Sequence, residues 1–156
     1  MKRTFILVAL CATALVAGVT AAQAGVLTNT TVSYAYSGFV PCANGGAGEL
    51  VTGTIDAHIL ETSTSNGKVA VSHLTWDAHG SLTGSSTGDT YRLGGVTHSV
   101  DVEHLESDRY TLTYINRYRL IAPGPGNNLV VRETAHVTAD GDNVIVDHDE
   151  FSIECS

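Results

Sequence analysis

After roughly the first two dozen residues, the chain alternates apolar or β-branched residues with polar ones, and Gly, Asn or Asp interrupts the pattern about every ten residues. A period of two is typical of strands with one buried face, and no helical period is present. Short strands at this spacing indicate an all-β sandwich or barrel. Eight strands are predicted, near residues 30–39, 49–61, 68–79, 88–93, 96–104, 110–121, 129–139 and 143–154.

Short turns join most of these predicted strands, so strands that are consecutive in sequence should pair in space. A meander of this kind removes its exposed edges by closing on itself. A closed sheet of about eight strands has an interior that side chains fill or that holds one small ligand. We therefore predict a single-domain antiparallel meander that forms a closed or nearly closed barrel, with a two-sheet β-sandwich as the alternative.

Turn residues set the first predicted register. Asn66-Gly67 favours a type I′ turn, because both residues tolerate a positive φ. This turn places Leu74 opposite Ile59 and Trp76 opposite Ala57. One face of the hairpin is then apolar and the other polar, as expected for a half-buried antiparallel pair.

Gly94-Gly95 is predicted to be a second tight turn, which separates 88–93 from 96–104. The loop after 96–104 has two possible lengths, and a one-residue slip would turn every side chain to the other face. An even-length loop sets the tyrosines opposite Asp101 and Leu105. We predict a three-residue loop, which instead gives the pairs Val96–Tyr118, Val100–Tyr114 and Val102–Leu112.

The last hairpin is predicted to turn at Asp140-Gly141, which sets Glu133 against His148. A four-residue turn would oppose Glu133 to Glu150, and like charges directly opposite each other are destabilising. The apolar phase then shifts along the final strand. We expect a β-bulge near His148-Asp149 to produce this shift.

The N-terminal segment has the pattern of a secretory signal peptide. A basic start precedes an apolar stretch at 5–19, and Ala22-Gln23-Ala24 matches a small-x-small cleavage site. We expect residues 1–24 to be the signal peptide and 25–156 to be a single all-β domain that is exported, either periplasmic or extracellular.

The charge of the expected mature domain bears on its partners. Loss of Lys2 and Arg3 changes the formal net charge from −8 to −8 − 2 = −10. An acidic surface of this size repels nucleic acid and anionic lipid headgroups. No second apolar segment of spanning length is present, so no membrane insertion is predicted. The oligomeric state stays open.

Two cysteines remain after the expected cleavage, Cys42 near the start of the domain and Cys155 near its end. An isolated pair in an oxidising compartment most simply forms one disulfide bond, and the alternative is two free thiols. The predicted bond ties the last strand to the beginning of the domain.

Polar side chains interrupt the inward-facing rows that these registers predict. Apolar walls with a few convergent polar groups are typical of a small-molecule site. The candidate ligand-binding residues are Tyr91, His98, Tyr114, Asn116, Tyr118, Glu133 and His148. In the alternative, these side chains only bond to neighbours in the core, because an unpaired buried polar group costs about 1–3 kcal/mol. Glu133 and His148 would then form a cross-strand ion pair.

Histidines also raise the question of a metal. His58 and His73 share one predicted face with Asp56 and Asp77, an inventory that suits a two-histidine, one-carboxylate site. The tight histidine spacing of strong metal motifs is missing, so no metal site is predicted. No nucleophile elbow, zinc-protease motif or phosphate loop occurs after residue 24, and no cofactor is predicted.

Four short phrases of the sequence, in this order, carry a resemblance: PCANGGAGE at 41–49, TGDTYRL at 87–93, GPGNN at 124–128 and FSIEC at 151–155. With them the chain resembles a group of small secreted bacterial proteins of unknown function. The resemblance covers nearly all of 25–156. It implies one domain and a Cys42–Cys155 link, and it implies no reaction, cofactor or site.

Three functions remain as hypotheses. The leading one is an exported, non-enzymatic β-barrel protein that binds a small, partly apolar ligand in its interior. The second is a structural or cell-surface interaction module that acts through its outer face. The third is an enzyme that uses His98 or His148 as a general base beside Glu133, since the near-neutral pKa of histidine suits that role.

Overall fold

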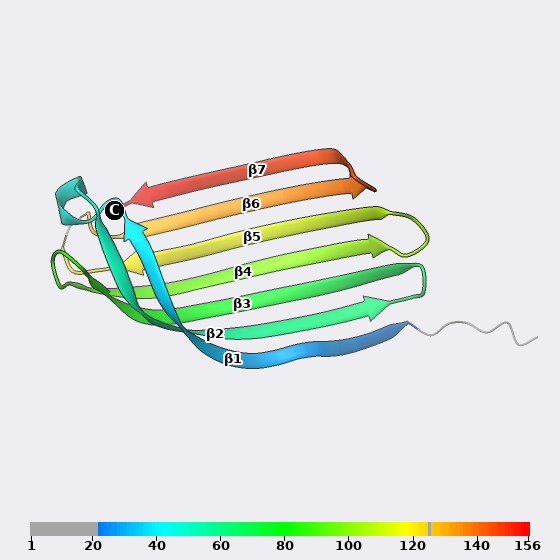
Figure 1. The fold of residues 1–156 in the computed structure, drawn as a ribbon, viewed down its shortest axis with the longest axis horizontal. Helices are drawn as coiled ribbons and strands as arrows, with labels where there is room; N and C mark the ends of the chain where they lie inside the picture. Colours follow the sequence, from blue (N-terminus) through cyan, green and yellow to red (C-terminus); the bar gives the residue numbers. More distant parts are fainter. Residues whose placement is uncertain (1–21, 125) are drawn as a thin grey trace, which may run out of the picture.

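Seven antiparallel strands form one sheet in the computed structural model, which describes residues 22–124 and 126–156 (Figure 1). The strands are β1 (Gln23–Val40), β2 (Glu49–Ser65), β3 (Val69–Gly84), β4 (Thr90–His104), β5 (Arg109–Ile121), β6 (Leu129–Asp140) and β7 (Asn143–Cys155). Their order in the sheet is their order in the sequence, which confirms the all-β antiparallel meander. A short 3₁₀ helix, η1 (Asn44–Gly46), follows β1. Of the expected signal peptide, residues 1–21 lie outside the described residues, and Gln23 and Ala24 belong to β1.

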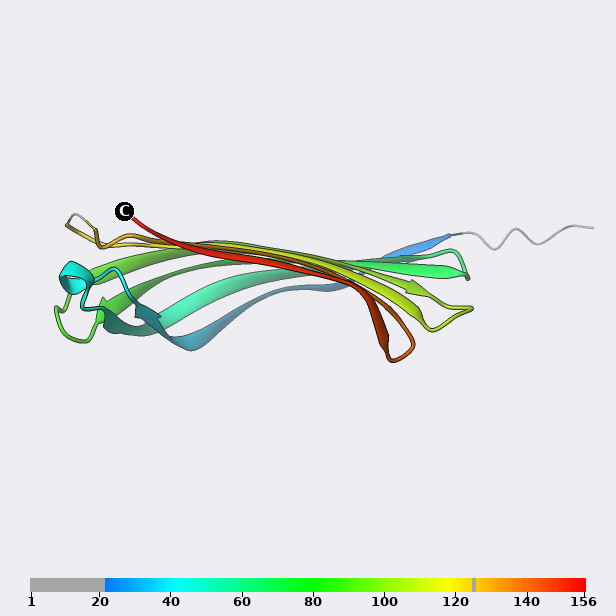
Figure 2. The ribbon, with the colours of Figure 1, turned by 90° about the horizontal axis from the view of Figure 1, so that it is seen from above.

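The sheet is nearly closed at one end only. No hydrogen-bonded ladder joins the edge strands β1 and β7 in the described chain, so hydrogen bonds do not close the sheet. At one end, the last part of β1 and the first part of β2 bend across the sheet toward the end of β7 (Figures 1 and 2). We call these two parts together the crossing segment. There the predicted disulfide bond between Cys42 and Cys155 joins the two edges, with a Cα–Cα distance of 5.6 Å. At the other end the sheet spreads open.

The prediction of eight strands was wrong because Gly94 and Gly95 do not form a turn. Both residues lie inside β4, which runs without interruption through the predicted strands 88–93 and 96–104. Gly95 lies opposite Tyr118, and a Cβ atom added at Gly95 would come within 2.6 Å of the Tyr118 Cβ. The absence of a side chain therefore permits a close approach between β4 and β5.

The β2–β3 hairpin has the predicted faces but not the predicted register. Ile59 pairs with Trp76, two residues from the prediction, so the same side chains stay on the apolar face. The turn is centred one residue later than predicted, with Gly67 at a φ of 84° in the first central position. Asn66 fixes this turn, because its Oδ1 accepts the N–H groups of Lys68 and Val69 at 3.0 and 2.9 Å.

The predicted three-residue loop between β4 and β5 was also wrong. The loop has the four residues between His104 and Arg109, and Val100 and Val102 lie opposite Thr113 and Thr111. Backbone bonds hold it, among them the Leu105 N–H donating to the Lys68 carbonyl at 2.8 Å. The valines therefore lie on the opposite face from the tyrosines of β5.

The final hairpin turns one residue later than predicted. Asp140 pairs with Asn143, and Glu133 lies opposite Phe151 rather than His148. A β-bulge does occur in β7, but its extra residue is Ile145, which lies between the partners of Thr138 and Ala139. The predicted bulge was thus correct in strand and misplaced along it.

Buried apolar side chains gather at the nearly closed end. There the crossing parts of β1 and β2 pack against the ends of the other strands, which gives two parts of one sheet a shared interior. The cluster contains Val40, Cys42, Ala43, Val51, Ile55, Leu82, Tyr91, Leu93, Leu120, Ala122, Leu129 and Val131. We call the face that carries this cluster the inner face, and the other the outer face.

Candidate functional site

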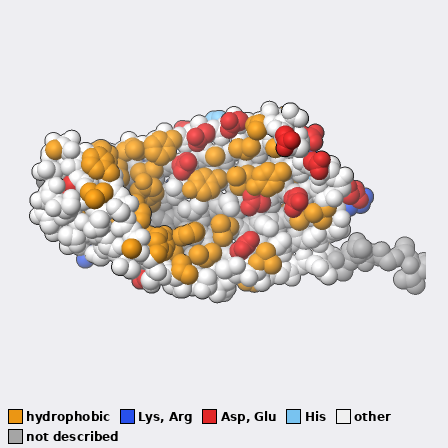
Figure 3. All heavy atoms as spheres, in the orientation of Figure 1, with side chains coloured by type: hydrophobic (Ala, Val, Ile, Leu, Met, Phe, Trp, Pro, Cys, Tyr) orange, Lys and Arg blue, Asp and Glu red, His pale blue; other side chains and the backbone are white. Residues whose placement is uncertain are grey.

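The inner face is hollowed beside the crossing segment, as Figure 3 shows in space-filling form. The hollow has a volume of about 440 Å³, which lies within the usual range for small-molecule sites. Strands β1 to β5 all contribute to it. Its lining residues are Tyr34, Tyr36, Ile55, Leu74, Trp76, Ala78, Leu93, Gly95, Thr97, Tyr114, Asn116 and Tyr118.

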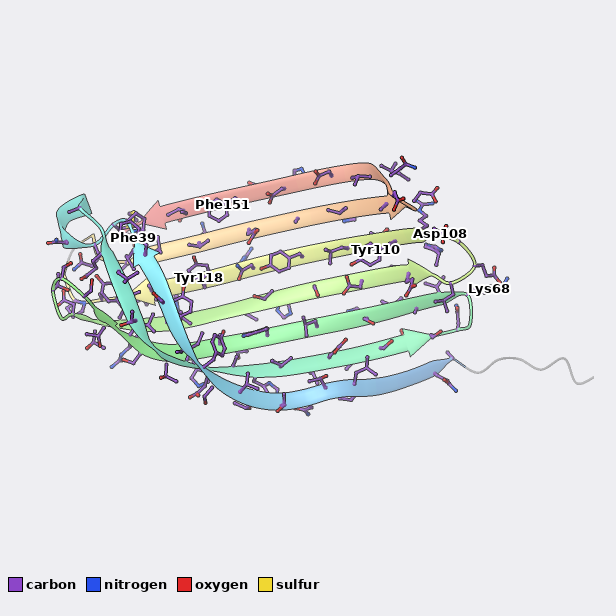
Figure 4. All side chains as sticks on the ribbon, in the orientation of Figure 1. Phe39, Lys68, Asp108, Tyr110, Tyr118 and Phe151 are labelled. Atoms are coloured by element: carbon purple, nitrogen blue, oxygen red, sulfur yellow. A yellow bond between two sulfur atoms is a disulfide. The ribbon has the colours of Figure 1, made fainter. Side chains whose placement is uncertain are left out.

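Five of the twelve lining residues are aromatic. Tyr34 and Trp76 meet edge to face, with ring centroids 6.0 Å apart and an interplanar angle of 88°. Burial raises the pKa of the Tyr36 and Tyr118 hydroxyls, and each is near a further acidic or phenolic group that acts in the same direction. Figure 4 shows Tyr118 near the crossing segment, on the face that also carries Tyr110 and Phe151.

A chain of hydrogen bonds crosses the apolar floor. Thr97 donates through Oγ1 to Asn116 Oδ1 at 3.1 Å, and Asn116 donates through Nδ2 to Glu133 Oε2 at 3.5 Å. The pairings Trp76–Thr97, Thr97–Asn116 and Asn116–Glu133 place these groups in one row across β3 to β6. Because directly opposite residues share a face of a sheet, the row points into the hollow and along its edge toward β7.

The structure brings together four of the seven predicted site residues. Tyr114, Asn116 and Tyr118 line the hollow, and Glu133 follows Asn116 in the row. The phenolic pKa of Tyr114 is raised, first by burial and then by the charge of Glu133, while a hydrogen bond with Thr97 opposes the shift.

The other three predicted residues lie elsewhere. Tyr91 belongs to the inner face but is fully buried in the core cluster, so it is not accessible to a ligand. His98 is on the outer face, where its Nδ1 lies 3.2 Å from Thr75 Oγ1. His148 is also on the outer face, opposite His136. The sheet therefore separates both histidines from Glu133, and the predicted general-base pair is not assembled.

The register error explains the misplaced histidine. The predicted turn at Gly94-Gly95 reversed the phase of 96–104, which moved His98 to the inner face. In the continuous strand, Tyr91 and Leu93 point inward, so His98 points outward.

Sequence reasoning missed Glu49, the buried carboxylate beside Tyr91. Its side chain is 2% exposed and accepts the Tyr91 hydroxyl proton at 2.6 Å. It also accepts the N–H groups of Ser86 and Thr87, both at 3.1 Å, and the Thr87 hydroxyl at 2.9 Å. The Tyr91 bond is the main reason that the pKa of Glu49 is lowered, against the opposing effect of burial. Glu49 therefore holds the β3–β4 loop on the core.

We call the contacts of Glu49 with Ser86, Thr87 and Tyr91 the Glu49 clamp, and a signal for it was present in the sequence. Glu49 ends the phrase at 41–49, and Thr87 and Tyr91 lie in the phrase at 87–93. The structure brings these two phrases into contact. Their role is structural, because neither Glu49 nor Tyr91 is accessible from the hollow.

The residues considered for a metal share the outer face without forming a cluster. His58 Nε2 lies 2.9 Å from Asn29 Oδ1, and His58 is opposite Asp77 in the sheet. Among residues 22–124 and 126–156, no group of three or more His, Cys, Asp or Glu side chains is placed to hold a metal ion. Within the same residues, no helix has the length and apolarity needed to cross a membrane.

Comparison with known proteins gives no relative: no family model, no curated protein and no solved structure matches this chain.

Proposed function

We propose that this chain is an exported binding protein that holds a small, partly apolar molecule in the hollow of its inner face. The observation that carries the proposal is the combination of five aromatic rings around the hollow with the row Thr97–Asn116–Glu133, which crosses its floor and ends at its edge. Apolar walls supply the area that a ligand buries, and a few placed polar groups orient it.

Export fits the covalent structure. Disulfide bonds persist in oxidising compartments and are rare in the cytosol. The Cys42–Cys155 bond joins the two edges of the sheet beside the hollow. It holds the crossing segment over one end of the inner face, and this segment supplies Tyr34, Tyr36 and Ile55 to the wall.

The chain contains its own reporter of binding. Trp76 is the only tryptophan of the sequence and lines the hollow. A titration with the neutral apolar dye N-phenyl-1-naphthylamine should change the fluorescence of Trp76 and raise that of the dye to a saturable limit.

Two neighbouring residues supply the variant and its control. Tyr114→Ala removes part of the wall and should weaken dye binding by about tenfold, the loss of one aromatic contact and its buried area. Ile115→Ala truncates the next residue, which points to the outer face and is 37% exposed, and should leave binding unchanged. Equal binding by both variants, or no response of Trp76 in the wild type, would refute the proposal.

A second candidate is an interaction module that uses the outer face. A shallow depression there is lined by Arg117, Arg119 and Arg132 together with Asp77, and Arg132 forms an ion pair with Glu154. Exposed arginines of this kind suit an anionic partner. In this case the double variant Arg117→Ala/Arg119→Ala should abolish capture of an envelope component that Tyr114→Ala still captures.

A further inference from the structure

We propose that the ligand of the hollow is a cation, an apolar body that carries an amine or quaternary ammonium group. This inference rests on the proposed function and names the class of ligand that the site selects. Three features of the inner face support it: its charges, the position of Glu133 and the aromatic wall.

The two faces of the sheet differ sharply in charge. In the observed registers, every histidine of the chain and every arginine of the described strands points to the outer face. The inner face of these strands has no basic side chain, and its accessible carboxylates are Glu61, Asp101, Glu103, Glu133, Asp147 and Asp149. Figure 3 shows acidic side chains between hydrophobic ones on the face that it presents. The potential over the hollow is therefore negative, which attracts cations and repels anions.

Glu133 lies at the edge of the hollow, directly opposite Asn116 of its lining. It is half-buried, its carboxylate accepts the Asn116 amide, and within the described residues it has no ion pair. Its charge contributes to the raised pKa of both Tyr114 and Tyr118, so it lies close to two rings of the wall. A half-buried carboxylate without a cation gains most from a ligand that supplies one.

The aromatic wall favours the same ligand. The face of a tyrosine or tryptophan ring attracts an ammonium group, and cages of such rings bind quaternary ammonium ligands. Trp76, Tyr34, Tyr36, Tyr114 and Tyr118 surround the hollow, and Glu133 lies at its edge. A second copy of this chain is a less suitable occupant, because two inner faces would bring carboxylates against carboxylates.

Three probes of nearly equal shape separate charge from apolar contact. They are phenyltrimethylammonium, its neutral isostere tert-butylbenzene, and the anion 4-tert-butylbenzoate. Trp76 fluorescence reports occupation of the hollow by each probe. The cation should bind about tenfold more tightly than the neutral isostere, as cation–π contacts predict, and the anion more weakly than either. Raising the salt concentration from about 10 mM to about 1 M shortens the screening length from about 30 Å to about 3 Å. This change should weaken the binding of the cation, leave that of the neutral probe unchanged and strengthen that of the anion, which the carboxylates no longer repel.

Glu133→Gln tests the carboxylate itself. It should reduce the affinity for phenyltrimethylammonium by about fivefold to tenfold and leave tert-butylbenzene unchanged. Glu150→Gln makes the same change of charge on the outer face, opposite Thr134, and should have no effect on either probe.

The possible failures are distinguishable. If the neutral probe binds as tightly as the cation in the wild type, the ligand class is wrong and the hollow remains a binding site. If neither these probes nor the neutral dye perturbs Trp76, the proposed function fails together with this inference. The wild-type probe series stands by itself if Glu133→Gln does not fold.

Discussion

Replacing Tyr91 by phenylalanine removes one hydroxyl group from the clamp around Glu49 and keeps the ring in the core. The Tyr91 hydroxyl donates to Glu49 Oε1 at 2.6 Å, and both residues are buried. A hydrogen bond to a charged group contributes about 1.5–3 kcal/mol. Glu49 keeps its three donors from Ser86 and Thr87, so no group is left without a partner. We therefore expect Tyr91→Phe to lower the free energy of unfolding by about 2 kcal/mol at neutral pH.

The pH dependence of this loss follows from the direction of the pKa shift. The pKa of Glu49 is lowered in the folded protein, chiefly by the Tyr91 hydroxyl. A group with a lowered folded pKa contributes stability above its unfolded pKa of about 4.3, and this stability is lost as the pH falls through the folded value. As the pH falls through this lowered pKa, the carboxyl becomes protonated, and the bond to Tyr91 weakens toward that of a neutral pair, about 1 kcal/mol.

Urea unfolding at pH 7 and at a series of acidic pH values, followed by Trp76 fluorescence, measures both quantities. The difference between wild type and Tyr91→Phe should be about twice as large at pH 7 as at the acidic end of the series, below the lowered pKa of Glu49. Tyr118→Phe is the control, because no partner of the Tyr118 hydroxyl is found in the described part of the chain, and it should change stability little at either pH. A Tyr91→Phe difference below about 0.5 kcal/mol at pH 7, or one that does not fall in acid, would refute the clamp.

Two further variants test the closed end and the floor of the hollow. Breaking the disulfide by Cys42→Ser/Cys155→Ser should lower the free energy of unfolding by about 4–5 kcal/mol, the chain-entropy value for a bond spanning 113 residues, and a denaturant titration that finds under about 1 kcal/mol would contradict this. Gly95→Ala should cost about 1–3 kcal/mol and displace Tyr118, because its new Cβ would lie 2.6 Å from the Tyr118 Cβ. Gly94→Ala, whose nearest neighbour is Arg119 Nε at 4.0 Å, is the matched control and should remain within about 1 kcal/mol of the wild type.

Alternation of apolar and polar residues was sufficient to predict the architecture. It predicted antiparallel strands in sequence order and the correct faces of the β2–β3 hairpin, although the register slipped by two residues. A slip of two preserves the faces, so a pattern of period two cannot detect it. Asn66 decides this register through side-chain bonds to the turn, and no property of the strands reveals them.

Glycine has two structural roles in a β protein, and the sequence alone does not distinguish them. Gly67 supplies a positive φ in a turn, whereas Gly95 leaves space for Tyr118 inside a continuous strand. Treating Gly94-Gly95 as a turn produced the eighth strand and reversed the phase of 96–104. His98 was assigned to the wrong face for this reason, since a one-residue change of phase turns every side chain of a strand to the other face.

The distribution of charged residues offers a criterion for strand register that the alternation of apolar residues does not provide. The predicted phase of 96–104 would place His98 and His104 on the inner face and move Asp101 and Glu103 to the outer one. The observed phase instead keeps every base of the described strands on one face and leaves the other with carboxylates alone. If the inner face binds a cation, a base among its tyrosines would compete with the ligand for Glu133 and repel it. Selection for such a ligand would therefore constrain the register, and the exclusion of bases from alternate positions would mark the binding face in the amino-acid sequence.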